Sequence, residues 1–121
     1  MTMAQHEEDR LHTHIWKALQ FILPDDAVAW STENRQMGPR EGMRRKARGC
    51  VPGVPDMEIH HRGRSFFIEI KTPKGTVSKI QKDMHQRLKR AGHAVAVCRS
   101  LEDVLFFLES HGVPLKGAVM A

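Results

Sequence analysis

The segment from Gly53 to Lys71 constrains the fold most, because it contains two short apolar runs separated by a turn pattern. The runs cover residues 57–60 and 65–71, and His61-Arg62-Gly63-Arg64 lies between them. Two runs of this length on either side of a glycine-containing turn predict a β-hairpin. Its tip is centred on Arg62-Gly63, which determines which residues of the two strands face each other.

Three charged side chains lie on one face of this predicted hairpin. The register places Asp56 directly opposite Glu69, where opposed Cβ atoms are about 4.5–5.5 Å apart. Lys71 shares the face of Glu69, because side chains alternate along a strand. Two carboxylates this close repel each other unless a cation lies between them, and a divalent metal ion and a lysine are the candidates. The other face is apolar and predicts a core face, with Met57, Ile59, Phe66, Ile68 and Ile70.

Periodicity and turn signals predict the elements around the hairpin. In chain order these are a helix over 5–23, a strand over 27–31, a loop over 32–52 with a helical piece around 41–47, the hairpin, a helix over 78–91, a strand over 94–98 and a helix over 100–111. Strand 65–71, helix 78–91 and strand 94–98 can form a right-handed β-α-β crossover. The predicted fold class is α/β, a mixed sheet flanked by helices.

The helix over 78–91 begins with a capping-box pattern, Ser78-Lys-Ile-Gln81. We expect its inner face to carry Ile80, Met84, Leu88 and Ala91, and its outer face to be basic, with Lys79, Lys82, Lys89 and Arg90. The next strand, 94–98, is apolar throughout, which predicts burial on both of its faces.

A length of 121 residues suits one domain, with a core over about 5–112 and a short tail over 113–121. No apolar run approaches the roughly 20 residues that span a bilayer, and the N-terminus lacks a signal-peptide pattern. The two cysteines, Cys50 and Cys98, form no disulfide framework, and Cys98 ends an apolar run that predicts its burial. We therefore expect a cytoplasmic protein, in a bacterial host or a phage-infected cell, with reduced thiols.

The net charge of +5 is concentrated between Arg35 and Arg48. This window holds a single acid, Glu41, against six basic residues: Arg35, Arg40, Arg44, Arg45, Lys46 and Arg48. The remainder of the chain is balanced. A concentrated basic segment is typical of contact with a polyanion such as nucleic acid, although a solvated loop with surplus charge has the same composition.

The order of these motifs resembles one known family. The matching segments are Gly53-Val54-Pro55-Asp56, Phe67-Ile68-Glu69-Ile70-Lys71, Gly75 before Ser78-x-x-Gln81, Gly92-x-x-Val95-x-Val97 and Ser100-Leu101-x-Asp103-Val104. Together they resemble the VRR-NUC branch, the virus-type replication-repair nucleases, of the PD-(D/E)xK nuclease superfamily. The similarity covers roughly residues 8–114, and it implies a restriction-endonuclease-like αβββαβ core.

The resemblance implies a metal-dependent active site. Asp56 and Glu69 would supply carboxylate ligands to Mg²⁺ or Mn²⁺, ions that prefer oxygen donors, and the backbone carbonyl of Ile70 would be a further ligand. Lys71 would position or activate the attacking water, which requires a partly desolvated ammonium near neutral pH. Gln81 matches a glutamine that orients the site, although its capping role alone also explains it.

The family commonly has an acid on the first helix, and Glu8 matches this position best. Glu7 is its rival, and a solvated first-turn acid is a simpler explanation of either. Further basic and polar residues are expected to contact DNA, mostly at phosphates: Asn34, Arg35, Arg44, Arg45, Lys46 and Arg48.

Two functions from different classes remain open. The first is a Mg²⁺- or Mn²⁺-dependent DNA endonuclease that cuts branched or structured DNA, as a Holliday junction resolvase does, and that acts as a homodimer. The second is a catalytically inactive nucleic-acid-binding module, because a nuclease fold alone does not establish cleavage. A helix-turn-helix regulator is a weaker third option, since the basic helix 78–91 precedes a strand. The choice of DNA over RNA also stays open.

Overall fold

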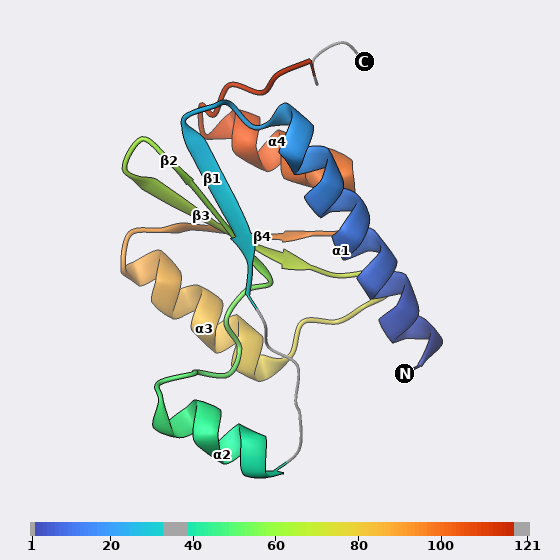
Figure 1. The fold of residues 1–121 in the computed structure, drawn as a ribbon, viewed down its shortest axis with the longest axis vertical. Helices are drawn as coiled ribbons and strands as arrows, with labels where there is room; N and C mark the ends of the chain where they lie inside the picture. The colour runs from blue at the N-terminus through green and yellow to red at the C-terminus, as the bar shows by residue number, and fades with distance from the viewer. Residues whose placement is uncertain (1, 33–38, 118–121) are drawn as a thin grey trace.

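The computed structural model describes residues 2–32 and 39–117 as a four-stranded sheet with helices on both faces (Figure 1). In chain order the elements are α1 (Met3–Ile22), β1 (Ala27–Ser31), α2 (Pro39–Ala47), β2 (Met57–His61), β3 (Arg64–Ile70), α3 (Lys79–Arg90), β4 (Ala94–Cys98) and α4 (Leu101–Ser110). The strand order is β1-β2-β3-β4. The first two pairs are antiparallel and β3 pairs with β4 in parallel, so the expected mixed α/β sheet is confirmed.

The hairpin has the predicted register. Met57 pairs with Ile68 and Ile59 with Phe66, which continues to Asp56 facing Glu69 at the open end. At the tip, Arg62 has φ 48° and Gly63 has φ 78°. Two successive positive φ angles are typical of the tight turns whose twist matches that of antiparallel strands.

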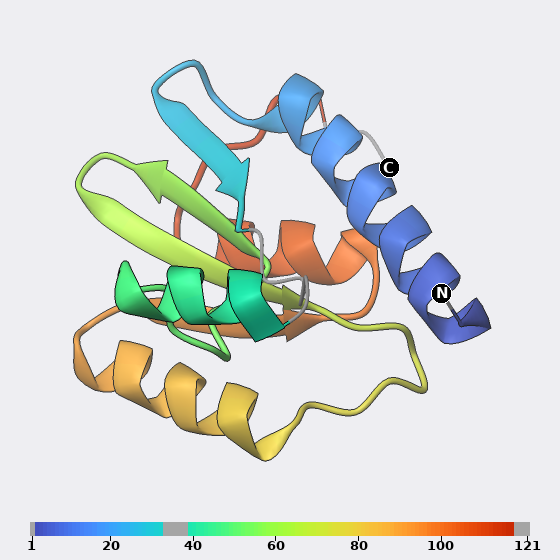
Figure 2. The same cartoon turned by 60° about the horizontal axis from the view of Figure 1, so that its bottom comes forward.

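The apolar face of the sheet is covered by α1 and α4, while α3 lies on the other face (Figures 1 and 2). All five residues predicted for the core face are essentially inaccessible to solvent. They pack with Ile15 and Leu19 of α1 and with Val104 and Leu108 of α4. Cys98 also lies in this cluster, as expected, and burial raises the pKa of its thiol to about 12. This core therefore holds the hairpin rigidly from one side, and the charged face is directed to α3.

Two of the predictions for the second half of the chain are wrong in part. β4 is an edge strand, so its outer backbone lacks a neighbour and Val97 is 36% exposed rather than buried. On α3, Ile80 is 58% exposed and Ala91 is an exposed cap residue, while His85 is buried. The inner face of α3 is thus turned toward a polar group of the sheet, which a search for an apolar stripe does not detect.

The helix ends follow local sequence signals. Ser78 caps α3 in a complete capping box with Gln81, as predicted, and Ser100 caps α4 by accepting a hydrogen bond from the Asp103 amide. Among the described residues, no helix is both long and apolar enough to cross a membrane.

Gly53 lies where the chain passes close to the start of α3. Its φ is +88°, and a Cβ atom at this position would lie 2.8 Å from the backbone oxygen of Ile80. Both the positive φ and the missing side chain are therefore required for the segment before Asp56 to pack against α3.

We expect Gly53→Ala to lower the free energy of unfolding by roughly 2–4 kcal/mol, because it combines backbone strain with a collision against main-chain atoms. Urea unfolding measures the change. Gly63→Ala is a matched control, since Gly63 has a similar φ of +78° and open space around it, and it should cost only about 1–2 kcal/mol. Equal losses in the two variants would show that the close approach at Gly53 has no energetic effect.

Candidate active site

Asp56 is held from two sides at the open end of the hairpin. Its backbone oxygen accepts a hydrogen bond from the Thr32 amide at 2.8 Å, which links it to the end of β1. Its Oδ2 atom accepts a hydrogen bond from the Ile70 amide at 2.7 Å. The Asp56 side chain thus makes the next hydrogen bond between the two strands, and its carboxylate is directed at the end of β3.

Glu69 is the most deeply buried acid of the charged face, with only 1% of its surface exposed. Each of its oxygens has a partner on α3: Gln81 Nε2 lies 3.3 Å from Oε2, and His85 Nε2 lies 3.3 Å from Oε1. Residues 81 and 85 are one helical turn apart, so both reach the same carboxyl group from one side of α3.

The carboxyl of Glu69 is strongly perturbed. Burial, a hydrogen bond with Asp56 and the negative charge of Asp56 together raise its pKa to about 9, against a smaller opposing effect of the Lys71 ammonium. The two carboxylates repel each other in a site with little solvent, so one proton is retained near neutral pH. A cation placed between the two carboxylates would offset their repulsion, and the proton would then be released.

Lys71 and Glu8 belong to the same electrostatic cluster. Lys71 follows β3 directly, its amide donates to the Cys98 oxygen at 3.1 Å, and its side chain is half-buried. Glu8 is half-buried on α1, and burial together with the charge of Asp56 raises its pKa, while Lys71 lowers it. Glu7, its rival from the sequence, is exposed. Of the two acids, Glu8 is the one whose charge interacts with the other site residues.

Gln81 both caps α3 and contacts the Glu69 carboxyl. Its Oε1 atom accepts a hydrogen bond from the Ser78 amide at 3.0 Å, which completes the helix cap. Its Nε2 atom is then directed to Glu69. The cap therefore fixes the orientation of the amide, and the start of α3 is joined to the charged face.

His85 was missed by the sequence analysis. It is buried, and burial and the nearby Lys89 charge lower its pKa, so the neutral ring can donate a hydrogen bond to Glu69. The signal that would have found it is its spacing of four residues from Gln81, which places both polar side chains on one face of the helix.

The donor set suits a hard divalent ion. It consists of the Asp56 and Glu69 carboxylates, whose oxygens are the ligands that Mg²⁺ prefers while retaining several waters. The amide of Ile70 donates to Asp56, so the backbone of Ile70 lies next to this carboxylate. Within residues 2–32 and 39–117 no group of three or more His, Cys, Asp or Glu side chains is arranged as a metal site.

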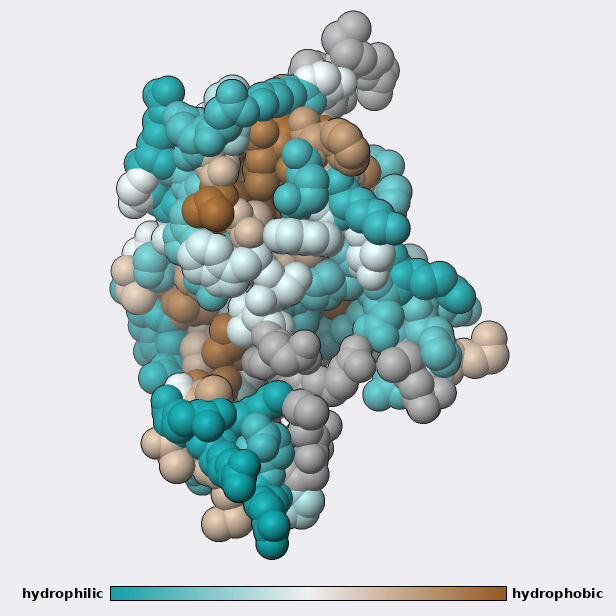
Figure 3. All heavy atoms as spheres, viewed as in Figure 1, coloured by the Kyte–Doolittle hydropathy of each residue, from teal (hydrophilic) through white to brown (hydrophobic). Residues whose placement is uncertain are grey.

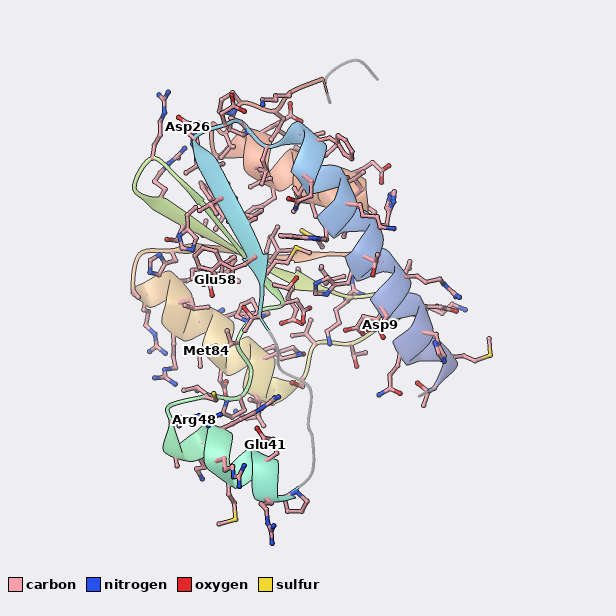
Figure 4. All side chains as sticks on the ribbon, in the orientation of Figure 1. Asp9, Asp26, Glu41, Arg48, Glu58 and Met84 are labelled. Carbon is pink, nitrogen blue, oxygen red and sulfur yellow. The ribbon has the colours of Figure 1, made fainter. Side chains whose placement is uncertain are left out.

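The basic segment forms α2, whose surface is mostly hydrophilic in Figure 3. Arg44, Lys46 and Arg48 are exposed. Arg45 is half-buried, and its Nε lies 3.7 Å from Glu41 Oε1. Asn34 and Arg35 lie outside the described residues. Figure 4 labels Glu41 on α2 and Arg48 just after it, whereas Asp26 lies beyond the opposite end of the sheet, so α2 lies toward the end where β2 begins.

Comparison with known proteins gives a consistent result. The sequence matches the family model of the VRR-NUC domain over residues 3–102. A solved structure described as a VRR_NUC domain protein has a TM-score of 0.64 and 18% identity, over 93% of this chain and 90% of that chain. Another, described as a VRR_NUC domain, has a TM-score of 0.54 and 22% identity, over 88% of this chain and 97% of that chain. At these identities the two structures support the fold alone, and no curated protein matches the chain.

The raised pKa of Glu69 predicts a pH-dependent stability. Unfolded, the group ionises near 4.5, whereas folded it ionises at about 9. The folded protein thus holds one proton more over this window, and the free energy of unfolding must fall as the pH rises through it. Glu69→Gln carries no charge at any pH and should lack this pH dependence. Between about pH 5 and about pH 8 we therefore expect the free energy of unfolding of the variant to rise by about 1–3 kcal/mol relative to that of the native chain.

Urea unfolding at both pH values measures this effect. Glu109→Gln replaces an exposed acid of α4 and serves as the control, with the pH dependence of the native chain. Parallel pH profiles for Glu69→Gln and the native protein would contradict the prediction.

Proposed function

Because this chain belongs to the VRR-NUC domain family, which is a family of nucleases, we propose that it is a metal-dependent DNA endonuclease that hydrolyses phosphodiester bonds. The observation that carries the proposal is the close pairing of the Asp56 and Glu69 carboxyls beside the positive charge of Lys71. Two carboxyl groups that hold a proton because of their mutual repulsion are suited to binding a metal cation in its place.

Each residue has a distinct role in this proposal. Asp56, Glu69 and the Ile70 carbonyl would hold Mg²⁺ or Mn²⁺, and Glu8 would add a ligand directly or through water. The ion would neutralise charge on the phosphate group and help the leaving oxygen. Lys71 would orient the attacking water and stabilise developing charge, which its half-buried position favours. Gln81 and His85 would keep the Glu69 carboxyl in place.

DNA is the proposed substrate because α2 and α3 each carry a positively charged surface. One is α2 with the exposed Arg44, Lys46 and Arg48, and the other is the outer face of α3. Such residues neutralise phosphates and give salt-dependent affinity without reading sequence. We further propose branched or structured DNA as substrate, and a homodimer as the active form, since cutting a two-fold junction requires two equivalent sites.

A cleavage panel tests the proposed function. We expect nicking of four-way junctions, flaps or splayed arms in preference to plain duplex with Mg²⁺ or Mn²⁺, and none with EDTA. Asp56→Ala, Glu69→Ala and Lys71→Ala should each reduce the rate at least about a thousandfold, because the three groups act as a unit. Tight binding without cleavage across metals and substrates would favour the inactive binding module instead, and cleavage of RNA alone would correct the substrate class.

A matched pair of acids on α1 tests the role of Glu8. We expect Glu8→Gln to lower the cleavage rate or the Mg²⁺ affinity about 10- to 100-fold, as removal of a supporting ligand does. Glu7→Gln removes the same charge from the adjacent exposed position and should leave both quantities unchanged. Equal effects of the two substitutions would remove Glu8 from the proposed site.

A further inference from the structure

Arg99 makes an unusual set of contacts just beyond the end of β4. Its Nη1 atom donates to the Thr72 oxygen at 2.6 Å and to the Gly75 oxygen at 2.6 Å. The Pro73 oxygen lies 3.4 Å from the same nitrogen. Three backbone oxygens of one short loop therefore converge on a single cationic group.

The loop that Arg99 holds joins the two halves of the candidate site. Residues 72–78 connect Lys71, at the end of β3, with the helix that carries Gln81 and His85. Within it the Gly75 amide donates to the Thr72 oxygen at 3.0 Å, which closes a turn. The Thr72 oxygen thus accepts from both Gly75 and Arg99, and the turn has little freedom to open while the guanidinium is present.

The position of Arg99 is itself well determined. β3 and β4 are parallel, so both strands end at the same edge of the sheet, and the Lys71 amide bonds to the oxygen of Cys98 directly before Arg99. The Arg99 amide donates to Asp103 Oδ2 at 2.8 Å, and the Asp103 amide donates to the capping Ser100 hydroxyl. The start of α4 thereby anchors the backbone of Arg99.

The energetic reason for the contact lies in the carbonyl dipoles. Three convergent backbone oxygens repel one another, and the contacts of Arg99 with the Thr72 and Gly75 oxygens are partly buried, so water hydrates these two oxygens incompletely. A charged donor satisfies them with hydrogen bonds that are stronger than those between neutral groups. Without it, the turn over 72–75 would rearrange so that these oxygens face water.

We propose that Arg99 is a positioning residue for the reaction: its guanidinium locks the 72–75 turn and so sets the placement of Lys71 relative to Gln81 and Glu69. This inference rests on the proposed nuclease function for its kinetic consequence, but the locking of the loop is a separate property of the fold. A shift of about 1 Å in a positioned group is enough to slow a reaction about a hundredfold.

The experiment compares the native chain with Arg99→Ala, using the DNA substrate that the native chain cleaves fastest. We expect the single-turnover rate to fall about 10- to 100-fold, with DNA affinity in Ca²⁺ changed less than about twofold because Arg99 faces the loop. Hydrogen exchange of the amides over 72–78 should accelerate, while exchange in β2 and β3 stays slow. Added methylguanidinium should restore part of the rate and of the protection.

Two further variants make the outcomes decisive. Arg64→Ala removes the same charge at the hairpin turn, away from the loop, and should retain native cleavage. Arg99→Gln keeps most of the side-chain stem and replaces the alanine variant if that variant unfolds at the assay temperature.

Native exchange over 72–78 together with native cleavage in a folded Arg99 variant would overturn the proposal. A loss confined to DNA affinity would also overturn it, because it would indicate a DNA contact. If the native chain cleaves no nucleic acid, the proposed function fails, and the loop exchange with and without methylguanidinium still decides whether Arg99 locks the turn.

Discussion

The pairing of β2 with β3 is the constraint on which the site depends. Asp56 faces the end of β3 because Met57 lies opposite Ile68. A slip of one residue would turn Glu69 toward the core formed with α1 and α4 and would bring an isoleucine to α3. The tight turn at Arg62-Gly63 opposes that slip because it sets the pairing locally. The apolar face of the hairpin opposes it as well, because its side chains would lose their burial. Packing against two helices thus determines the geometry of carboxyl groups on the opposite side of the sheet.

Glu69 is a buried carboxyl that the packed sheet keeps in an energetically unfavourable position. Its charged form is disfavoured by burial and by the neighbouring Asp56 carboxyl, yet its place on the sheet face that α3 covers keeps the side chain away from solvent. Gln81 donates a hydrogen bond to this carboxyl and His85 Nε2 lies within hydrogen-bonding distance of it, so the buried group keeps polar partners. Functional sites commonly retain groups of this kind at some expense of stability, and the surrounding core compensates for it.

Features that depend on neighbours in the chain were accessible from the sequence. The hairpin register follows from a two-residue turn and a period of two, and the caps at Ser78 and Ser100 follow from hydrogen bonds to residues three positions away. The prediction for α3 was wrong where an apolar stripe was assumed to face inward. Ile80 is exposed although its backbone oxygen lies close to Gly53, and His85 is buried because Glu69 stands opposite it. Neither partner is close in sequence, so the local spacing places Gln81 and His85 on one face of the helix but does not show what that face contacts.

The same distinction, between local contacts and contacts of distant segments, applies to the residues of the candidate site. Residue order and spacing were sufficient to identify two carboxylates and a lysine on one hairpin face, because alternation along a strand is a property of the backbone. The burial of Glu69, the partial burial of Glu8 beside an exposed Glu7, and the hydrogen bonds of Arg99 to the loop after Lys71 arise from contacts between α1, α3, β4 and the hairpin. Burial and electrostatic environment are collective effects of packed elements. For this reason only the tertiary structure decides the surroundings of Glu8, His85 and Arg99.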